Sequence, residues 1–148
     1  MITRYFKFIS IFHTTKIRKL KYIEGLKIVV ISDLTLRELE DAPPKVSNIV
    51  EEIPEQYKKY VVLDDNAKYL ADKYIEEEAI SRKHLVDAQQ IAIATINKVD
   101  VLVSWNFKHI VNLNRIRLYN ATNLKYGYQI IEIRTPREII NEVINEDV

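Results

Sequence analysis

"HLVDAQQIAIATINKVDVLVSWNF", residues 84–107, is the stretch that decides the fold. Apolar residues fill most positions of a helical segment, and a strand-like run, Val101 to Trp105, follows within a few residues. An apolar helix leading into an apolar strand is typical of a parallel sheet covered by helices. Asp87 stands near the helix start, where an ionised carboxylate in apolar surroundings costs several kcal/mol unless it is paired. The sequence thus predicts a partner for Asp87, either a structural cap or a metal ion.

The same alternation of strand and helix extends over the rest of the chain. Helical periodicity is expected at about 15–24, 34–40, 44–53, 65–75, 84–97, in short pieces over 107–126, and from 136 onward. Strands are expected at about 5–12, 27–31, 60–63, 101–105 and 129–133. This pattern predicts a three-layer α/β/α sandwich with a mostly parallel central sheet of about five strands. Sites in such folds form beyond the carboxyl ends of the strands, so residues there are the first candidates for a functional role.

Length and composition narrow the class of protein. The 148 residues suit a single domain, 1–148, with a core of its own. The chain has no cysteine, which excludes disulfides and thiolate chemistry, and only two glycines, too few for a glycine-rich nucleotide loop. No apolar run approaches the roughly 20 residues of a membrane span, and Lys7 interrupts the only signal-like segment. We therefore expect a cytoplasmic protein with no membrane association.

Charge is unevenly distributed along the chain. The whole sequence has a net charge of +1, but residues 1–27 hold seven basic side chains and one acid, a local net charge of +6. A basic end can bind nucleic acid or an acidic partner, although a solvated basic helix is the commoner explanation.

Three polar residues follow or face strand ends. Glu38 lies in the helix after the second expected strand, Asp87 opens the helix before the fourth, and Asn106 follows that strand. All three can point into one crevice. Each also has a structural explanation: Glu38 as an exposed helix acid, Asp87 as a first-turn residue favoured by the helix dipole, and Asn106 as a turn or helix cap.

Several motifs together resemble the PIN-domain family, which includes the VapC-like toxins of toxin–antitoxin pairs. The resemblance covers roughly residues 26–140 and rests on four segments taken as a set: "SDLTLRELE" (32–40), "LVDAQQIAIAT" (85–95), "VDVLVSWNFKHIVN" (99–112) and "IIEIRTPREII" (130–140). It implies a Mg²⁺- or Mn²⁺-dependent nuclease that cuts RNA, with an antitoxin protein as a partner. By motif, Glu38 and Asp87 match the family's metal-binding acids, and Asn106 falls where many members carry a further acid. Hard divalent cations suit such oxygen ligands.

The N-terminal part departs from this family. Members begin with a strand that ends in an aspartate, but here His13 takes that position, with Thr14 and Thr15 after it. Imidazole suits zinc, nickel or copper better than magnesium, so His13 is a poor replacement. Residues 1–25 are therefore an atypical part of the domain, either divergent or the product of a shifted start, and the activity is expected to be weakened.

Two functions stay open at the level of sequence. One is a PIN-like endoribonuclease that uses Glu38, Asp87 and Asn106. The other is a catalytically inactive PIN fold that serves as a binding or dimerising module, which the missing acid favours; a small ligand-binding α/β domain is more remote. Tyr119, Tyr126 and Tyr128 could form the face of a homodimer or belong to the core, and His84 and His109 fit surface positions near the crevice.

Overall fold

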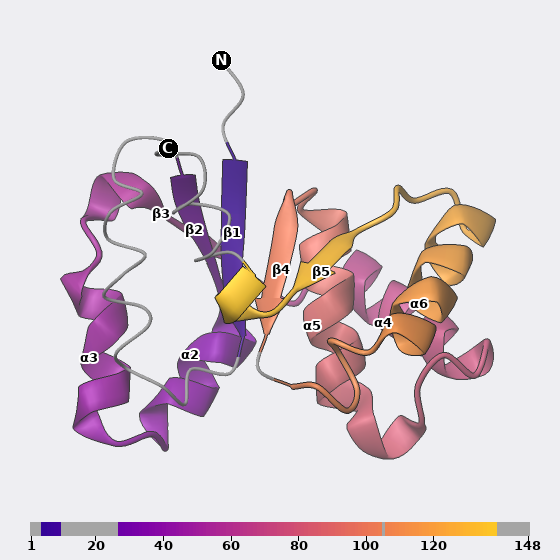
Figure 1. The fold of residues 1–148 in the computed structure, drawn as a ribbon, viewed down its shortest axis with the longest axis horizontal. Coiled ribbons are helices and arrows are strands. Elements are labelled where there is room, and N and C mark those ends of the chain that lie inside the picture. Colours follow the sequence, from indigo (N-terminus) through magenta and orange to yellow (C-terminus); the bar gives the residue numbers. More distant parts are fainter. Residues whose placement is uncertain (1–3, 10–26, 105, 139–148) are drawn as a thin grey trace.

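The computed structural model describes residues 4–9, 27–104 and 106–138. Within them the chain is a mixed α/β protein with parallel strands, so the predicted fold class is confirmed at that level (Figure 1). The expected basic helix at 15–24, the stop at Gly25, and His13 with its two threonines lie outside the described residues. Trp105 and all but the start of the expected terminal helix, whose first residues are 136–138, lie outside them as well.

Every strand pairing is parallel. β2 pairs with β3, β4 pairs with β5, and β1 joins the two pairs by contacting β2 on one side and β4 on the other. The resulting order is β3-β2-β1-β4-β5, which leaves β3 and β5 at the outer edges. The strands are β1 (Arg4–Ile9), β2 (Lys27–Ser32), β3 (Lys58–Val61), β4 (Val101–Ser104) and β5 (Glu132–Arg134).

The connecting helices lie on either side of these strands. In Figure 1, α2 and α3 lie toward the left, α4 and α6 lie at the right, and α5 lies partly behind β5. The α-helices are α2 (Asp33–Glu40), α3 (Pro44–Glu52), α4 (Asp65–Glu76), α5 (Leu85–Ile96) and α6 (Leu113–Lys125). Two short 3₁₀ helices, η2 (Glu55–Tyr57) and η3 (Arg82–His84), precede β3 and α5.

Local chemistry explains where the helices begin and end. Ser32 and Asp64 cap α2 and α4 by accepting hydrogen bonds from Thr35 N (3.2 Å) and Ala67 N (2.8 Å), as expected for N-cap side chains. The predicted cap of the α4 helix at Asp64 or Asp65 is thus confirmed. Gly127 follows α6 with φ at 83°, in the left-handed conformation that glycine adopts without strain.

Three predicted boundaries were wrong. The edge strand predicted at 60–63 is observed as β3 at Lys58–Val61, and the one at 129–133 is observed as β5 at Glu132–Arg134. An edge strand pairs with one neighbour only, so the length of that neighbour sets where the pairing stops. The sequence pattern within the edge strand does not encode that length. The short helices expected over 107–126 are a turn followed by the single helix α6, capped by Asn112.

The core lies mainly between α4, α5 and the strands. Leu70, Ile91, Ile93 and Leu102 are fully buried, and α5 packs on α4 with almost every residue from Ala88 to Thr95 buried. This explains the continuous apolar run that marked residues 84–107. Burial of apolar surface, to which this run contributes, is the main favourable contribution to folding.

A buried polar network ties α4, α5 and α6 together. The Tyr74 hydroxyl lies 2.5 Å from Asn123 Oδ1, to which it donates, and 3.3 Å from Thr95 Oγ1. Burial raises the pKa of the Tyr74 hydroxyl. The Tyr74 ring also meets Tyr119 edge-on at 5.4 Å between centroids. Tyr119 is fully buried, so it belongs to the core and not to a dimer face.

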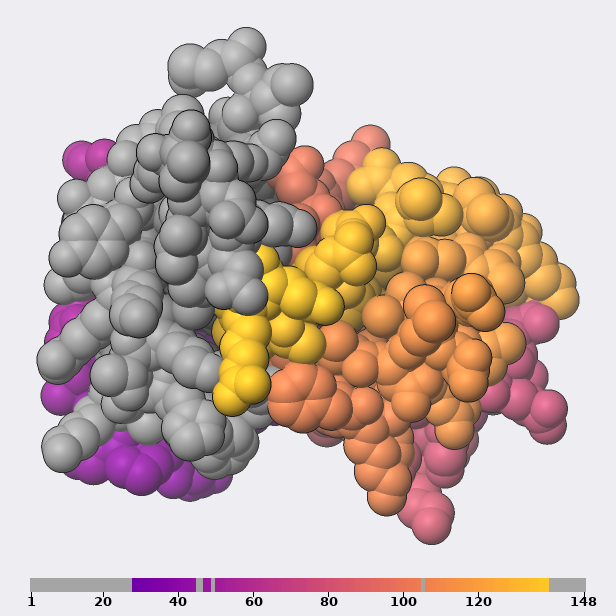
Figure 2. Space-filling view, in the orientation of Figure 1, coloured from indigo at the N-terminus to yellow at the C-terminus, as the bar shows by residue number. Residues whose placement is uncertain are grey.

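The other two tyrosines considered for a dimer face are partly buried. Tyr128 packs against the core, and the Tyr126 hydroxyl donates to Glu77 Oε1 at 3.0 Å. On the face seen in Figure 2, the orange surface of α6 adjoins the yellow surface of β5. Asn120 makes this junction, because it donates to Ile131 O (3.1 Å) and accepts from Ile131 N (2.7 Å). None of the described helices is long and apolar enough to cross a membrane.

Candidate functional site

The three predicted site residues gather at the carboxyl ends of the central strands. Glu38 is on α2, which directly follows β2; Asp87 is in the first turn of α5; and Asn106 is two residues beyond β4. Glu38 and Asp87 are 49 positions apart in the sequence, yet the charge of Asp87 acts on the Glu38 carboxyl. The structure therefore brings the two acids into one region.

The Glu38 carboxyl has an unusual environment for an acid on an exposed helix position. Partial screening of the carboxyl from water raises its pKa above the ordinary 4.5, the Gln90 amide opposes this by lowering the pKa, and Asp87 raises it further. Neither of the described groups that act on Glu38 is positively charged. We call Glu38 and Asp87 the acidic pair. No basic side chain among these groups neutralises the charge of its Glu38 carboxyl.

Asp87 is less buried than its apolar sequence context suggested, since its side chain is 24% exposed. Its Oδ2 accepts a hydrogen bond from Asn106 Nδ2 at 3.2 Å and lies 4.0 Å from His84 Nδ1. The Asn106 amide is therefore a partner of the kind that the sequence predicted for Asp87, although the carboxylate is less enclosed by apolar side chains than expected. The helix turns so that the Asp87 side chain points toward the rim while Ala88 and Ile91 face the core.

Asn106 combines the two roles that the sequence left open. Its Oδ1 accepts from His109 N at 3.0 Å, which caps the turn after β4, as predicted. Its Nδ2 donates to Asp87, so the same side chain also orients the carboxylate of the acidic pair. Asn106 N is held in turn by the buried Ser104 Oγ at 3.0 Å.

Gln90 is a site residue that sequence reasoning missed. It is fully buried on α5, and its Oε1 accepts a hydrogen bond from Ser32 Oγ at 3.3 Å. Its Nε2 has no hydrogen-bond partner among the described residues, and the amide acts on Glu38. A buried unpaired donor is costly and calls for an acceptor. The available signal was a glutamine in the otherwise apolar segment "QQIAIAT" (89–95).

The donor set fits a hard cation only in part. Two carboxylates and coordinating waters are enough to hold Mg²⁺. Among the described residues, however, no group of three histidine or acidic side chains could hold a metal ion. A site here would therefore take one or two protein ligands and water.

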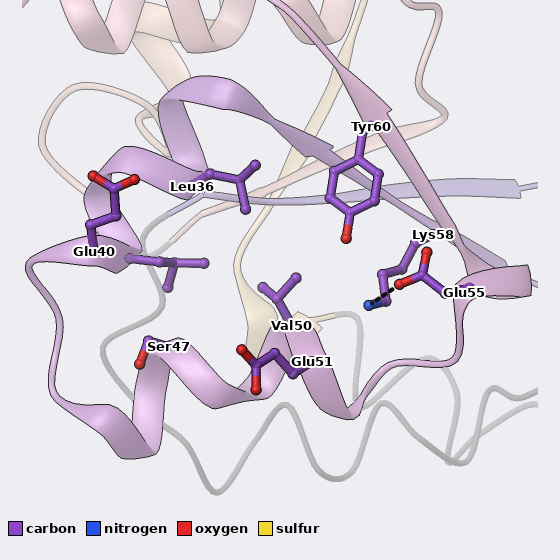
Figure 3. A pocket seen from close by; sticks show the side chains of 9 residues that line it. Leu36, Glu40, Ser47, Val50, Glu51, Glu55, Lys58 and Tyr60 are labelled. Atoms are coloured by element: carbon purple, nitrogen blue, oxygen red, sulfur yellow. Dashed lines mark hydrogen bonds and ion pairs between the residues drawn. The ribbon is translucent and has the colours of Figure 1, made fainter.

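A separate groove of about 410 Å³ lies between α2, α3 and β3 (Figure 3). Leu36, Leu39 and Val50 give it an apolar wall, and Lys58 Nζ pairs with Glu55 Oε1 at 3.0 Å within it. Glu40, Ser47, Glu51 and Tyr60 complete the lining. Neither Glu38 nor Asp87 lines this groove, so it is not the crevice that the sequence predicted for the acidic pair.

No protein-family model, curated protein or solved structure matches the chain. The resemblance to PIN domains therefore rests on the residues of this sequence alone.

The raised pKa of Glu38 predicts a pH-dependent cost to folding. Because the folded state keeps the proton to higher pH than the unfolded state, stability falls as pH rises through the interval above 4.5. The Glu38→Gln variant should lack this decline, so its advantage in urea midpoint over the parent protein should grow between pH 4.5 and pH 7. The control is Glu40→Gln, an exposed acid on the same helix. A constant difference across this range would show that the Glu38 carboxyl is fully hydrated.

Proposed function

We propose that this protein is a PIN-like, metal-dependent endoribonuclease with a three-layer α/β/α fold, and that it works as the toxin of a toxin–antitoxin pair. The observation that carries the proposal is that Glu38 and Asp87, from separate segments that match PIN motifs, lie near enough for the charge of Asp87 to raise the pKa of the Glu38 carboxyl. The order of parallel strands and the position of both acids beyond the strand ends support it. RNA is the proposed substrate, and an antitoxin and a second copy of the chain are the proposed partners.

Each residue has a defined part in this proposal. Glu38 and Asp87 would hold Mg²⁺ or Mn²⁺. Neither of the described groups that act on the Glu38 carboxyl is basic, so its negative charge is available to a cation. When bound, such a cation supplies water activation and offsets charge on a phosphate. Asn106 orients Asp87 through its 3.2 Å hydrogen bond, and the Gln90 amide, which lowers the pKa of Glu38, offers an N–H donor beside that carboxyl.

A second candidate is the catalytically inactive PIN-like module that binds or dimerises. The absence of a three-ligand cluster from the described residues favours it, as does an asparagine, Asn106, at the position where many PIN domains have an acid. The two candidates differ in whether a metal binds the acidic pair.

Titration with Mg²⁺ or Mn²⁺ should raise the thermal midpoint of the parent protein, because a ligand that binds only the folded state stabilises it. At a metal concentration of roughly 100 times Kd, the gain is about 2.7 kcal/mol, or about 5–10 °C for a chain of this size. Glu38→Gln and Asp87→Asn should lose the response, and Glu76→Gln, an exposed acid on α4, should keep it. No response in the parent protein, or an equal response in all four proteins, would rule out the metal site and leave the inactive module.

A further inference from the structure

Two histidines from distant segments stack beside the acidic pair. His84 ends η3 and His109 lies in the turn after β4, and their rings are 3.7 Å apart between centroids with an interplanar angle of 29°. His84 Nδ1 lies 4.0 Å from Asp87 Oδ2. We call His84 and His109 the histidine stack. It therefore lies directly beside Asp87, the proposed catalytic carboxylate.

The backbone on both sides of the histidine stack is fixed. Asn106 Oδ1 accepts from His109 N at 3.0 Å, and the hydroxyl of the buried Tyr119 donates to His109 O. On the other side, His84 N donates to Ser81 O at 2.9 Å within the 3₁₀ turn. The stack is thus held in place before any ligand binds, which lowers the entropic cost of using it as a binding surface.

The surroundings of His109 disfavour the protonated form of its ring. Burial lowers the pKa of His109, and its neighbours His84, Lys108 and Arg115 lower it further, against the opposing effect of Asp87. Both rings stay partly open to solvent, since the His84 side chain is 34% exposed and His109 is of intermediate burial. The histidine stack therefore presents a planar aromatic surface that is partly exposed to solvent.

We infer that the histidine stack is a nucleobase-binding subsite, which seats one base of a single-stranded RNA as a third layer next to the acidic pair. This inference rests on the proposed nuclease function. Bases of single-stranded RNA stack readily on aromatic side chains, histidine included, and such stacking tolerates different base sequences. Lys83 and Lys108 are exposed beside the stack, where they can attract the flanking phosphates.

The test is the affinity for a short fluorescein-labelled single-stranded RNA, measured by anisotropy in EDTA so that metal-dependent cleavage is absent. His109→Ala and His84→Ala should each weaken binding by roughly 5- to 100-fold, the range that loss of one stacking contact produces. His109→Phe keeps a planar ring without nitrogen atoms, so it should bind within about twofold of the parent protein. The control is Tyr60→Ala, which removes an exposed aromatic ring, 50% accessible, on β3.

Three results would overturn the inference. They are no measurable binding of RNA by the parent protein, unchanged binding by His109→Ala, and binding by His109→Phe as weak as that of His109→Ala. The thermal response to Mg²⁺ tests the nuclease function independently, because it depends on Glu38 and Asp87. Loss of the stacking effect with an intact metal response would overturn only the subsite, and the reverse result would overturn only the metal site.

Discussion

Asp87→Asn is expected to reduce metal-dependent RNA cleavage by at least about 100-fold, because disturbing the partner of a metal ligand alone costs 10- to 100-fold. The change removes one negative charge and keeps the size of the side chain. In the parent protein Asn106 Nδ2 lies 3.2 Å from Asp87 Oδ2. The amide oxygen of the variant can still accept this hydrogen bond, so the fold should survive. Cleavage of a labelled single-stranded RNA in Mg²⁺ and in Mn²⁺, followed on a gel, measures the effect.

The matched control for this variant is Asp72→Asn. Asp72 is an acid on α4 whose side chain is 51% exposed and which lies 3.9 Å from Arg82 in a weak surface pair. It should cleave at the parent rate. If Asp87→Asn cleaves as fast as the parent protein, Asp87 takes no part in catalysis. If the parent protein itself does not cleave RNA while it still binds metal, the inactive module is the better description.

Tyr74→Ala is expected to lower the free energy of unfolding by about 3–5 kcal/mol, the cost of truncating a large buried aromatic side chain. Tyr74 is fully buried, meets Tyr119 edge-on, and donates to Asn123 from a helix that packs on α5. A domain of this kind has a total stability of about 5–15 kcal/mol, so the loss is a large part of it. Urea unfolding followed by circular dichroism measures the change.

Tyr69→Ala is the control, since Tyr69 lies on the same helix α4 but is 51% exposed. It should cost much less, because most of its surface is already in water. Tyr74→Phe separates packing from hydrogen bonding: it keeps the ring and leaves Asn123 Oδ1 without its donor, at a cost of about 1–3 kcal/mol. Equal effects of the alanine changes at 69 and 74 would contradict the observed burial.

Sequence reasoning worked best where the local pattern carries the physical cause. The apolar run over 84–107 predicts a helix that leads into a strand, as observed for α5 and β4, and Ser32 and Asp64 mark helix starts because their side chains replace missing backbone partners. The edge strands β3 and β5 were misplaced because their limits depend on a neighbouring strand. The site was predicted in part: Glu38, Asp87 and Asn106 do converge. Gln90 and the histidine stack were missed because their roles depend on residues 25 or more positions away.

The two outer strands of the sheet restrict how copies of this protein can associate. β3 carries Lys58 and Lys59, and β5 carries Glu132 and Arg134, so charged side chains stand on both outermost strands. Charges at such positions oppose the addition of a strand from another molecule, which is a common route to fibrous aggregates. We therefore expect self-association of this protein, where it occurs, to use helical surfaces instead of a sheet that continues from one molecule into the next.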